Sequence, residues 1–155
     1  MLHKTLIIFI LLWGIVFSEE ENDLTILSWN IKMLTGPYGW VHNRVERAEN
    51  IVQALKSSGN YDVILFQETF SEKIRELMYE GLKTLYPYQI IPGDKTCIGK
   101  SNSGLWVISK SPINILDEIS FSNQKNWDAL SSKGAKLYSV VQDEQKFHII
   151  NTHLQ

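Results

Sequence analysis

Three polar side chains each come directly after a mostly apolar run: Asn30 after LTILSW, Glu68 after VILFQ and His153 after FHIINT. A carboxylate such as that of Glu68 suits Mg²⁺, which usually binds one or two carboxylates, several waters and substrate phosphate oxygens. Asn30 can donate a hydrogen bond to a phosphate or orient the carboxylate, and His153 can donate to a phosphoryl oxygen or to a leaving oxygen. These residue types therefore predict metal-assisted chemistry on a phosphate ester.

The elements before Asn30 and Glu68 are predicted to form a crossover unit. Residues 24–30 and 63–66 are predicted strands, and the helix between them is predicted to begin at the N-cap Asn43, with its apolar residues at helical spacing. A strand, a helix and a strand in this order predict a parallel pair. Sites in open α/β sheets gather at the carboxyl ends of strands, where Asn30 and Glu68 stand.

The second half of the chain is predicted to consist mainly of strands. A second helix is predicted to start at Ser71 and to continue through Leu85, until Tyr86 and Pro87 stop it. A short turn at residues 143–146 predicts a hairpin. The strands predicted after the second helix are 88–91, 105–109, 113–121, 135–141 and 147–152. Strands with helices outside them predict an α+β fold, a layered β-sandwich flanked by helices.

The composition limits the classes of function. The chain has 155 residues, 44% hydrophobic and 21% charged, which predicts one ordinary globular domain. It holds 15 Lys and Arg against 17 Asp and Glu, for a net charge of −2. Because no excess of cations is available to hold a phosphate backbone, nucleic acid is not the expected partner.

The first residues of the chain predict secretion. Lys4 precedes an apolar run at residues 6–17, which is shorter than the roughly 20 residues of a membrane-crossing helix. Val16 and Ser18 fit a cleavage site, so residues 1–18 are predicted to be a signal peptide of a secreted, extracellular protein. The alternative is an uncleaved amphiphilic anchor. In an oxidising compartment the single Cys97 is free, paired with another chain, or bonded to sequence beyond these residues.

The segments around these positions carry a resemblance to a known family. Ser28-Trp29-Asn30-Ile31, Gln67-Glu68 and Asn151-Thr152-His153-Leu154-Gln155 resemble the metal-dependent endonuclease, exonuclease and phosphatase superfamily. Other segments look like those of secreted, neutral sphingomyelinases of the bacterial type. These segments are Gln67-Glu68-Thr69-Phe70, residues 103–113 and residues 128–134. The likeness extends from about Leu24 to the last residue, with the spacing between successive motifs maintained.

The resemblance implies a deoxyribonuclease-like, two-sheet sandwich and hydrolysis of sphingomyelin, in a membrane surface, to ceramide and phosphocholine. It implies Mg²⁺, or alternatively Mn²⁺ or Co²⁺, held chiefly by Glu68 with the help of Asn30, and His153 near the scissile phosphate. Asp128 and Lys133 match a loop that these sphingomyelinases need for activity. The alternative for Asp128 and Lys133 is a solvated ion pair in a long loop.

The sequence departs from the family in one respect. Members continue roughly as far again and carry an Asp-x-Asn and a Ser-Asp-His motif there, and these 155 residues contain neither motif. Residues 19–155 are therefore interpreted as the N-terminal part of one domain, an incomplete sandwich with an uncovered apolar sheet face and little activity. Two other hypotheses remain: a Mg²⁺-dependent nuclease of the same superfamily, and a secreted non-catalytic relative that acts as an interaction protein.

Overall fold

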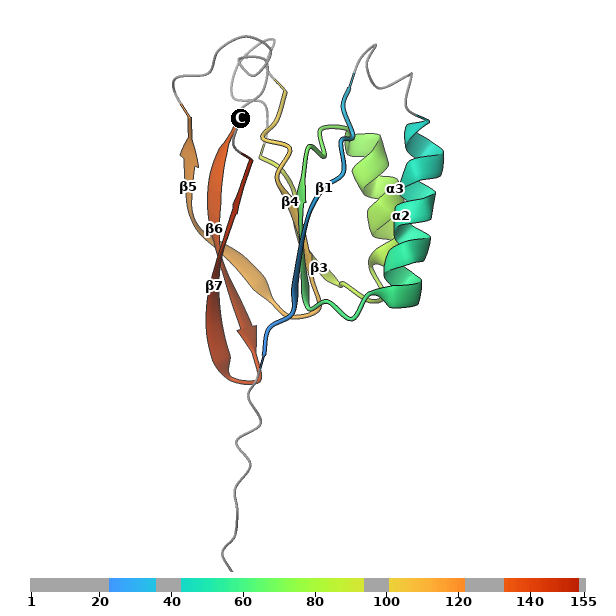
Figure 1. The fold of residues 1–155 in the computed structure, drawn as a ribbon. Helices are drawn as coiled ribbons and strands as arrows, with labels where there is room; N and C mark the ends of the chain where they lie inside the picture. The colour runs from blue at the N-terminus through green and yellow to red at the C-terminus, as the bar shows by residue number, and fades with distance from the viewer. Residues whose placement is uncertain (1–22, 36–42, 94–100, 122–132, 154–155) are drawn as a thin grey trace, which may run out of the picture.

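The computed structural model describes residues 23–35, 43–93, 101–121 and 133–153. The signal peptide predicted at residues 1–18, Cys97 and Asp128 lie outside these residues, so their predicted roles remain predictions. In the described part of the chain, no helix is long and apolar enough to cross a membrane. These four segments form two β-sheets and two helices, which confirms the predicted α+β class (Figure 1).

The first sheet contains four strands in the order β1-β2-β4-β3. Strand β1 covers Ile26–Asn30, β2 covers Val63–Gln67, β3 covers Tyr88–Ile90 and β4 covers Trp106–Ser109. Strands β1 and β2 are parallel, as the predicted crossover unit requires, and the other pairs are antiparallel. The carboxyl ends of β1 and β2 therefore lie at the same edge of the sheet, at the top of the molecule in Figure 1.

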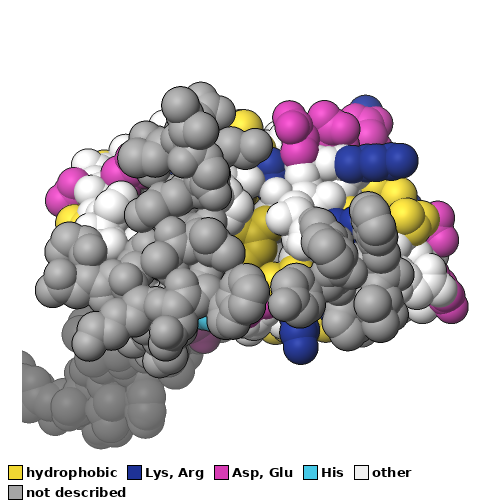
Figure 2. Space-filling view, turned by 90° about the horizontal axis from the view of Figure 1, so that it is seen from above, with side chains coloured by type: hydrophobic (Ala, Val, Ile, Leu, Met, Phe, Trp, Pro, Cys, Tyr) yellow, Lys and Arg dark blue, Asp and Glu magenta, His cyan; other side chains and the backbone are white. Residues whose placement is uncertain are grey.

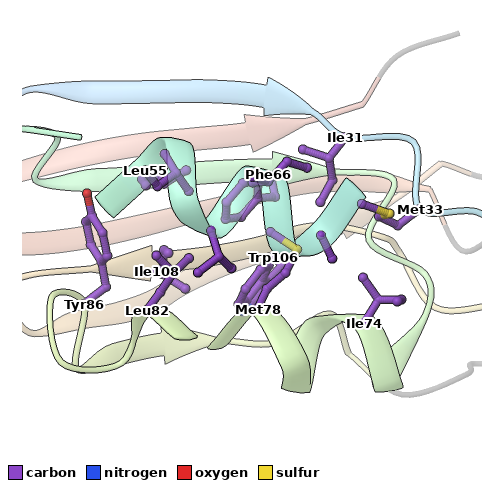
Figure 3. Close-up of a cluster of buried hydrophobic side chains, with 14 residues drawn as sticks. Ile31, Met33, Leu55, Phe66, Ile74, Met78, Leu82, Tyr86, Trp106 and Ile108 are labelled. Carbon is purple, nitrogen blue, oxygen red and sulfur yellow. The ribbon is translucent and has the colours of Figure 1, made fainter. Parts of the chain in front are cut away.

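Two helices cover one face of this sheet. Helix α2 covers Arg44–Ser58 and α3 covers Glu72–Leu82, and both lie on the side away from the second sheet (Figure 1). Their apolar faces pack against the sheet in a buried cluster, where the rings of Phe66 and Trp106 stack with centroids 4.8 Å apart. The cluster includes Ile31, Met33, Leu55, Ile74, Met78, Leu82, Tyr86 and Ile108 (Figure 3). The predicted amphipathic helices therefore form the outer layer.

Helix α3 is shorter than predicted. It ends at Leu82, whereas the apolar spacing extends it to Leu85, so the predicted end is wrong. The carbonyl oxygen of Leu82 accepts the backbone N–H groups of both Leu85 and Tyr86, at 2.9 Å each. This tightened last turn inserts the Tyr86 side chain into the core, where it is fully buried. The gain in buried aromatic surface favours the turn over another helical residue.

The second sheet contains three antiparallel strands in the order β5-β6-β7. Strand β5 covers Ile113–Ser120, β6 covers Gly134–Gln142 and β7 covers Gln145–Thr152. The sheet packs face to face on the first one through a mostly apolar core that joins the two layers. That inter-sheet core consists of Val63, Leu65, Val107, Ile113, Tyr138, Val140 and Ile149. The two sheets and the helices thus form the layered sandwich that the sequence predicts.

The outer face of the second sheet carries apolar side chains in contact with solvent. Side chains alternate along strands, so Ile119, Val141 and Ile150 point away from the inter-sheet core. Their exposed fractions are 58%, 45% and 64%. Within the described residues, no helix lies on this face (Figure 1). An uncovered apolar sheet face is what the sequence predicts.

Candidate active site

The three residues singled out in the sequence meet at the ends of β1, β2 and β7. The Nδ2 atom of Asn30 donates a hydrogen bond of 3.1 Å to Oε1 of Glu68. The Nε2 atom of His153 lies 3.4 Å from that carboxylate oxygen and 3.5 Å from Asn30 Nδ2. These contacts join the two sheets at one end of the molecule, the end that Figure 2 views from above.

The backbone of Glu68 explains how its carboxylate reaches Asn30. Leu27 and Trp29 pack toward the helices, so Asn30, on the other parity of β1, faces the second sheet. On β2 the residues that face the second sheet are Val63, Leu65 and, by the same alternation, Gln67. Strict alternation would therefore turn the Glu68 side chain toward the helices.

Glu68 instead has a φ of +57°, in the left-handed region that a residue with a side chain seldom adopts. This conformation breaks the alternation and turns the carboxylate toward Asn30. The strand ends stay joined beyond this point, because Met33 donates its backbone N–H to the Glu68 carbonyl oxygen at 2.9 Å. Such strain costs roughly 1–3 kcal/mol and concentrates at functional sites.

The orientation of the Asn30 amide is also fixed. The backbone N–H of Lys32 donates a 3.1 Å hydrogen bond to Asn30 Oδ1, which leaves the NH₂ group facing Glu68. Lys32 itself has a φ of +49°, so the chain turns sharply just after β1. Because a carbonyl oxygen has two lone pairs, Asn30 Oδ1 retains capacity for a second partner such as a cation or a metal-bound water.

The Glu68 carboxylate is only partly satisfied by the side chains around it. The side chains of Glu68 and His153 are each 18% exposed. The Oε2 atom of Glu68 is buried and accepts no hydrogen bond from any part of the described chain. A buried carboxylate oxygen without a donor is costly, and a bound cation would offset that cost.

The donor atoms around this carboxylate suit Mg²⁺ better than a metal ion that takes all of its ligands from the protein. Within the four described segments, no group of three or more His, Cys, Asp or Glu side chains could hold a metal ion. One carboxylate, with the NH₂ group of Asn30 against it, leaves most of the coordination to water and substrate. Mg²⁺ is commonly bound in this way, through one or two carboxylates plus phosphate oxygens.

Two further residues, Gln67 and Asn151, belong to the site although the sequence analysis assigned them no role. The Gln67 side chain donates a 2.8 Å hydrogen bond from Nε2 to Asn151 Oδ1, across the two sheets. Both side chains are buried, with exposed fractions of 7% and 1%. The signal in the sequence is a pair of amides on the inward faces of apolar strands, where a buried polar group needs a partner.

Three other residues, Lys133, Asp128 and His148, differ in where they lie relative to the site. Lys133, the residue before β6, is buried, with an exposed fraction of 8%. Asp128, its predicted partner, lies outside the described residues. His148 lies on β7 opposite Ser139, on the face turned away from the site, and is exposed.

Known proteins with sequence similarity include phospholipid-cleaving enzymes of bacteria. Residues 27–140 match the Endonuclease/Exonuclease/phosphatase family. A sphingomyelinase C of Leptospira interrogans is 31% identical over 153 residues, a match that covers 88% of this chain and 27% of that protein. A sphingomyelinase C of Bacillus cereus is 28% identical over 152 residues, covering 89% of this chain and 45% of that protein.

Solved structures with the same fold include the beta toxin of Staphylococcus aureus. A hairpin-deletion mutant of this toxin superposes with a TM-score of 0.72 at 26% identity, covering 86% of this chain and 51% of the toxin. A second mutant, with bound magnesium ions, superposes with a TM-score of 0.71 at 26% identity, covering 84% of this chain and 49% of the toxin. The chain spans between about a quarter and a half of these relatives' lengths.

Proposed function

Because this chain belongs to the Endonuclease/Exonuclease/phosphatase family, we propose that Asn30, Glu68 and His153 form the metal- and phosphate-binding centre of a sphingomyelin phosphodiesterase. The observation that carries the proposal is the contact of Glu68 Oε1 with both Asn30 Nδ2 and His153 Nε2, at 3.1 and 3.4 Å. With a divalent cation on the acid, an acid, an amide and an imidazole where the two sheets meet suit an anionic phosphodiester.

Glu68 is the proposed principal ligand of the divalent cation, with Asn30 beside it. The buried Oε2 atom, which has no donor among the described residues, supports this assignment. Magnesium is the proposed ion, with Mn²⁺ and Co²⁺ as alternatives, and the beta toxin mutant with bound magnesium supports that choice. When bound, such a cation polarises the phosphoryl oxygens and offsets the charge on the departing alkoxide.

Asn30 and His153 are proposed to act on the substrate side of the carboxylate. Asn30, held by Lys32, keeps the Glu68 carboxylate in one orientation. His153 is proposed to donate a hydrogen bond to a phosphoryl oxygen or to the leaving oxygen of ceramide. Asp128 and Lys133 are proposed to contribute to the phosphate-binding loop, and the burial of Lys133 is compatible with a charge held inside a site.

Sphingomyelin is the proposed substrate, presented in a membrane surface, and the protein is proposed to be secreted. Relatives named sphingomyelinase C or phospholipase C support this choice. The net charge of −2 does not favour a nucleic-acid substrate, which would require phosphate contacts from cations. The predicted signal peptide at residues 1–18 supports an extracellular location.

The first experiment measures metal binding by the full chain. Isothermal titration with MgCl₂, and with MnCl₂ as a second probe, compares the native chain with Glu68→Gln. We expect saturable binding that Glu68→Gln abolishes, since a neutral amide replaces the charged carboxylate. Equal binding by the two proteins would overturn the assignment of Glu68.

The second experiment identifies the substrate. Release of labelled phosphocholine from sphingomyelin vesicles is compared with release from phosphatidylcholine vesicles and with nicking of supercoiled plasmid. We expect release of phosphocholine from sphingomyelin that depends on Mg²⁺, since the proposed cation would polarise the phosphoryl oxygens. Sphingomyelin turnover that EDTA and Glu68→Gln both abolish supports the proposal. Nicking that depends on Glu68 would favour the nuclease. Absence of both reactions would favour the non-catalytic relative.

A further inference from the structure

The side chains of Gln67 and Asn151 form a small hydrogen-bonded network between the two sheets, here called the amide clamp. Gln67 Nε2 donates to Asn151 Oδ1 at 2.8 Å, and Asn151 Nδ2 donates to the backbone oxygen of Phe66 at 3.2 Å. Gln67 Nε2 also lies 3.1 Å from Ser28 Oγ on β1. The amide clamp therefore joins β1 and β2 of the first sheet to β7 of the second.

Each member of this network lies just before a residue of the candidate site. Gln67 precedes Glu68 directly, and Asn151 stands two residues before His153. Ser28 likewise stands two residues before Asn30. Because side chains two apart share one face of a strand, the network lies directly beneath the site on β1 and β7.

The amide clamp supplies directional contacts between the two sheets, which the inter-sheet core lacks. That core is mostly apolar, and apolar contacts are not directional, so they tolerate a small slide of one sheet on the other. Hydrogen bonds between buried amides depend on distance and angle, and a slide of 1 Å breaks them. Gln67 and Asn151 are almost completely buried, so water cannot replace a lost partner cheaply.

We infer that Gln67 and Asn151 are positioning residues, whose amide clamp fixes β7 against β1 and β2 and so sets the distances among the Asn30 amide, the Glu68 carboxylate and the His153 imidazole. The inference rests on the function proposed for Asn30, Glu68 and His153. Groups that orient metal ligands in this way typically account for 10- to 100-fold in metal affinity or activity. Removing either amide should therefore weaken metal binding without touching a metal ligand.

The test uses the full chain with Gln67→Met, Asn151→Leu and the double variant, all of similar volume to the native side chains. Gln89→Leu is the matched control, because Gln89 lies in the same sheet and its Oε1 accepts a 3.0 Å hydrogen bond from Trp106 Nε1, away from the site. Thermal unfolding reports the stability of every variant. Titration with MnCl₂ and MgCl₂ reports metal affinity.

A second readout works without metal. The side-chain amide protons of Asn30, assigned in NMR spectra by comparison with Asn30→Asp, report the hydrogen bond to Glu68 through their exchange with solvent. Disruption of the amide clamp should speed this exchange at least tenfold, whereas Gln89→Leu should leave it unchanged. This measurement distinguishes a failed positioning role from a failed metal site.

We expect each single variant to raise the metal dissociation constant at least tenfold. The double variant should have a dissociation constant no higher than that of the weaker-binding single variant, because each substitution removes the same shared bond. Unchanged affinity together with unchanged Asn30 exchange, alongside lower melting temperatures, would overturn the inference and leave a purely structural pair. If the native chain binds no metal, the proposed function fails and the Asn30 exchange alone decides the inference. If Asn151→Leu does not fold, Gln67→Met, which removes the same shared bond, decides the inference under the same criteria.

Discussion

Replacement of Glu68 by glutamine should stabilise the metal-free protein while abolishing its response to metal. The variant keeps an acceptor oxygen for Asn30 Nδ2 but removes a buried charge, one of whose oxygens has no hydrogen-bond donor among the described residues. Removal of such an unsatisfied charge raises the free energy of unfolding by about 1–2 kcal/mol. For a chain of 155 residues this corresponds to a rise in melting temperature of roughly 2–8 °C.

Magnesium should reverse the order of the melting temperatures of the native chain and Glu68→Gln. A ligand at 100 times its dissociation constant stabilises the native state by about 2.7 kcal/mol, which only the chain with Glu68 can gain. Differential scanning calorimetry in EDTA and in excess MgCl₂ therefore compares four melting temperatures. Glu68→Gln should melt higher in EDTA, and the native chain should match or exceed it in MgCl₂.

The control for this experiment is Glu80→Gln, which removes an exposed carboxylate. Glu80 forms a 2.6 Å ion pair with Lys83 on α3, where both side chains are at least half exposed. Exposed pairs of this kind contribute about 0–1 kcal/mol, so both melting temperatures should stay close to the native values. A Glu68→Gln variant that melts lower than the native chain in EDTA, or that keeps the full magnesium shift, would refute the reasoning.

Three further substitutions test the fold around the site. Tyr138→Phe should leave the protein as stable or more stable at pH 7 in urea titrations, because its buried hydroxyl has no partner among the described residues. Burial raises the pKa of Tyr138, so the native chain should lose stability as the pH rises above about 10, and the variant should lose less. Gly104→Ala should lower the unfolding free energy by about 1–3 kcal/mol, since φ is +70° and the new Cβ would meet Phe70 Cε1 at 2.7 Å. Trp106→Ala should cost about 3–5 kcal/mol in the same titrations, because the fully buried indole stacks on Phe66.

The sequence predicts the elements of this fold well where apolar spacing is regular. The parallel pair of β1 and β2 follows from two apolar runs around one amphipathic helix, and hydrophobic burial enforces that arrangement. The start of α2 after Asn43 is also confirmed, but the capping differs from the expectation. Asn43 has a left-handed backbone, and its side chain donates to Glu46 rather than capping a backbone N–H.

Left-handed backbone positions were the main features that the sequence did not reveal. The β6–β7 hairpin turns through Asp143 and Glu144, both with positive φ, although neither is the glycine that signals such a turn. Glu68 is the more important case, since its conformation turns the carboxylate into the site. Backbone propensity favours other residues, such as glycine, at positions of positive φ. The surrounding strand contacts hold the chain in this strained conformation.

The residues of the site were predictable one by one, but their supporting contacts were not. Asn30, Glu68 and His153 stand out because each ends an apolar strand. Gln67 and Asn151 are amides within such strands, and their pairing depends on how one sheet docks on the other. Local spacing holds no information on that docking, so a bond between residues 84 positions apart could not be predicted.

The distance along the chain between Asn30 and His153, 123 residues, has a consequence for biosynthesis. Asn30 and Glu68 emerge from the ribosome early and can pair within the first sheet, but the imidazole arrives only when β7 has been synthesised and has docked. Contacts between residues so far apart form late, after the loop-closure entropy has been overcome. A nascent polypeptide therefore holds the amide and the carboxylate before it holds the imidazole, and the contact between Glu68 and His153 marks a chain whose two layers have already come together.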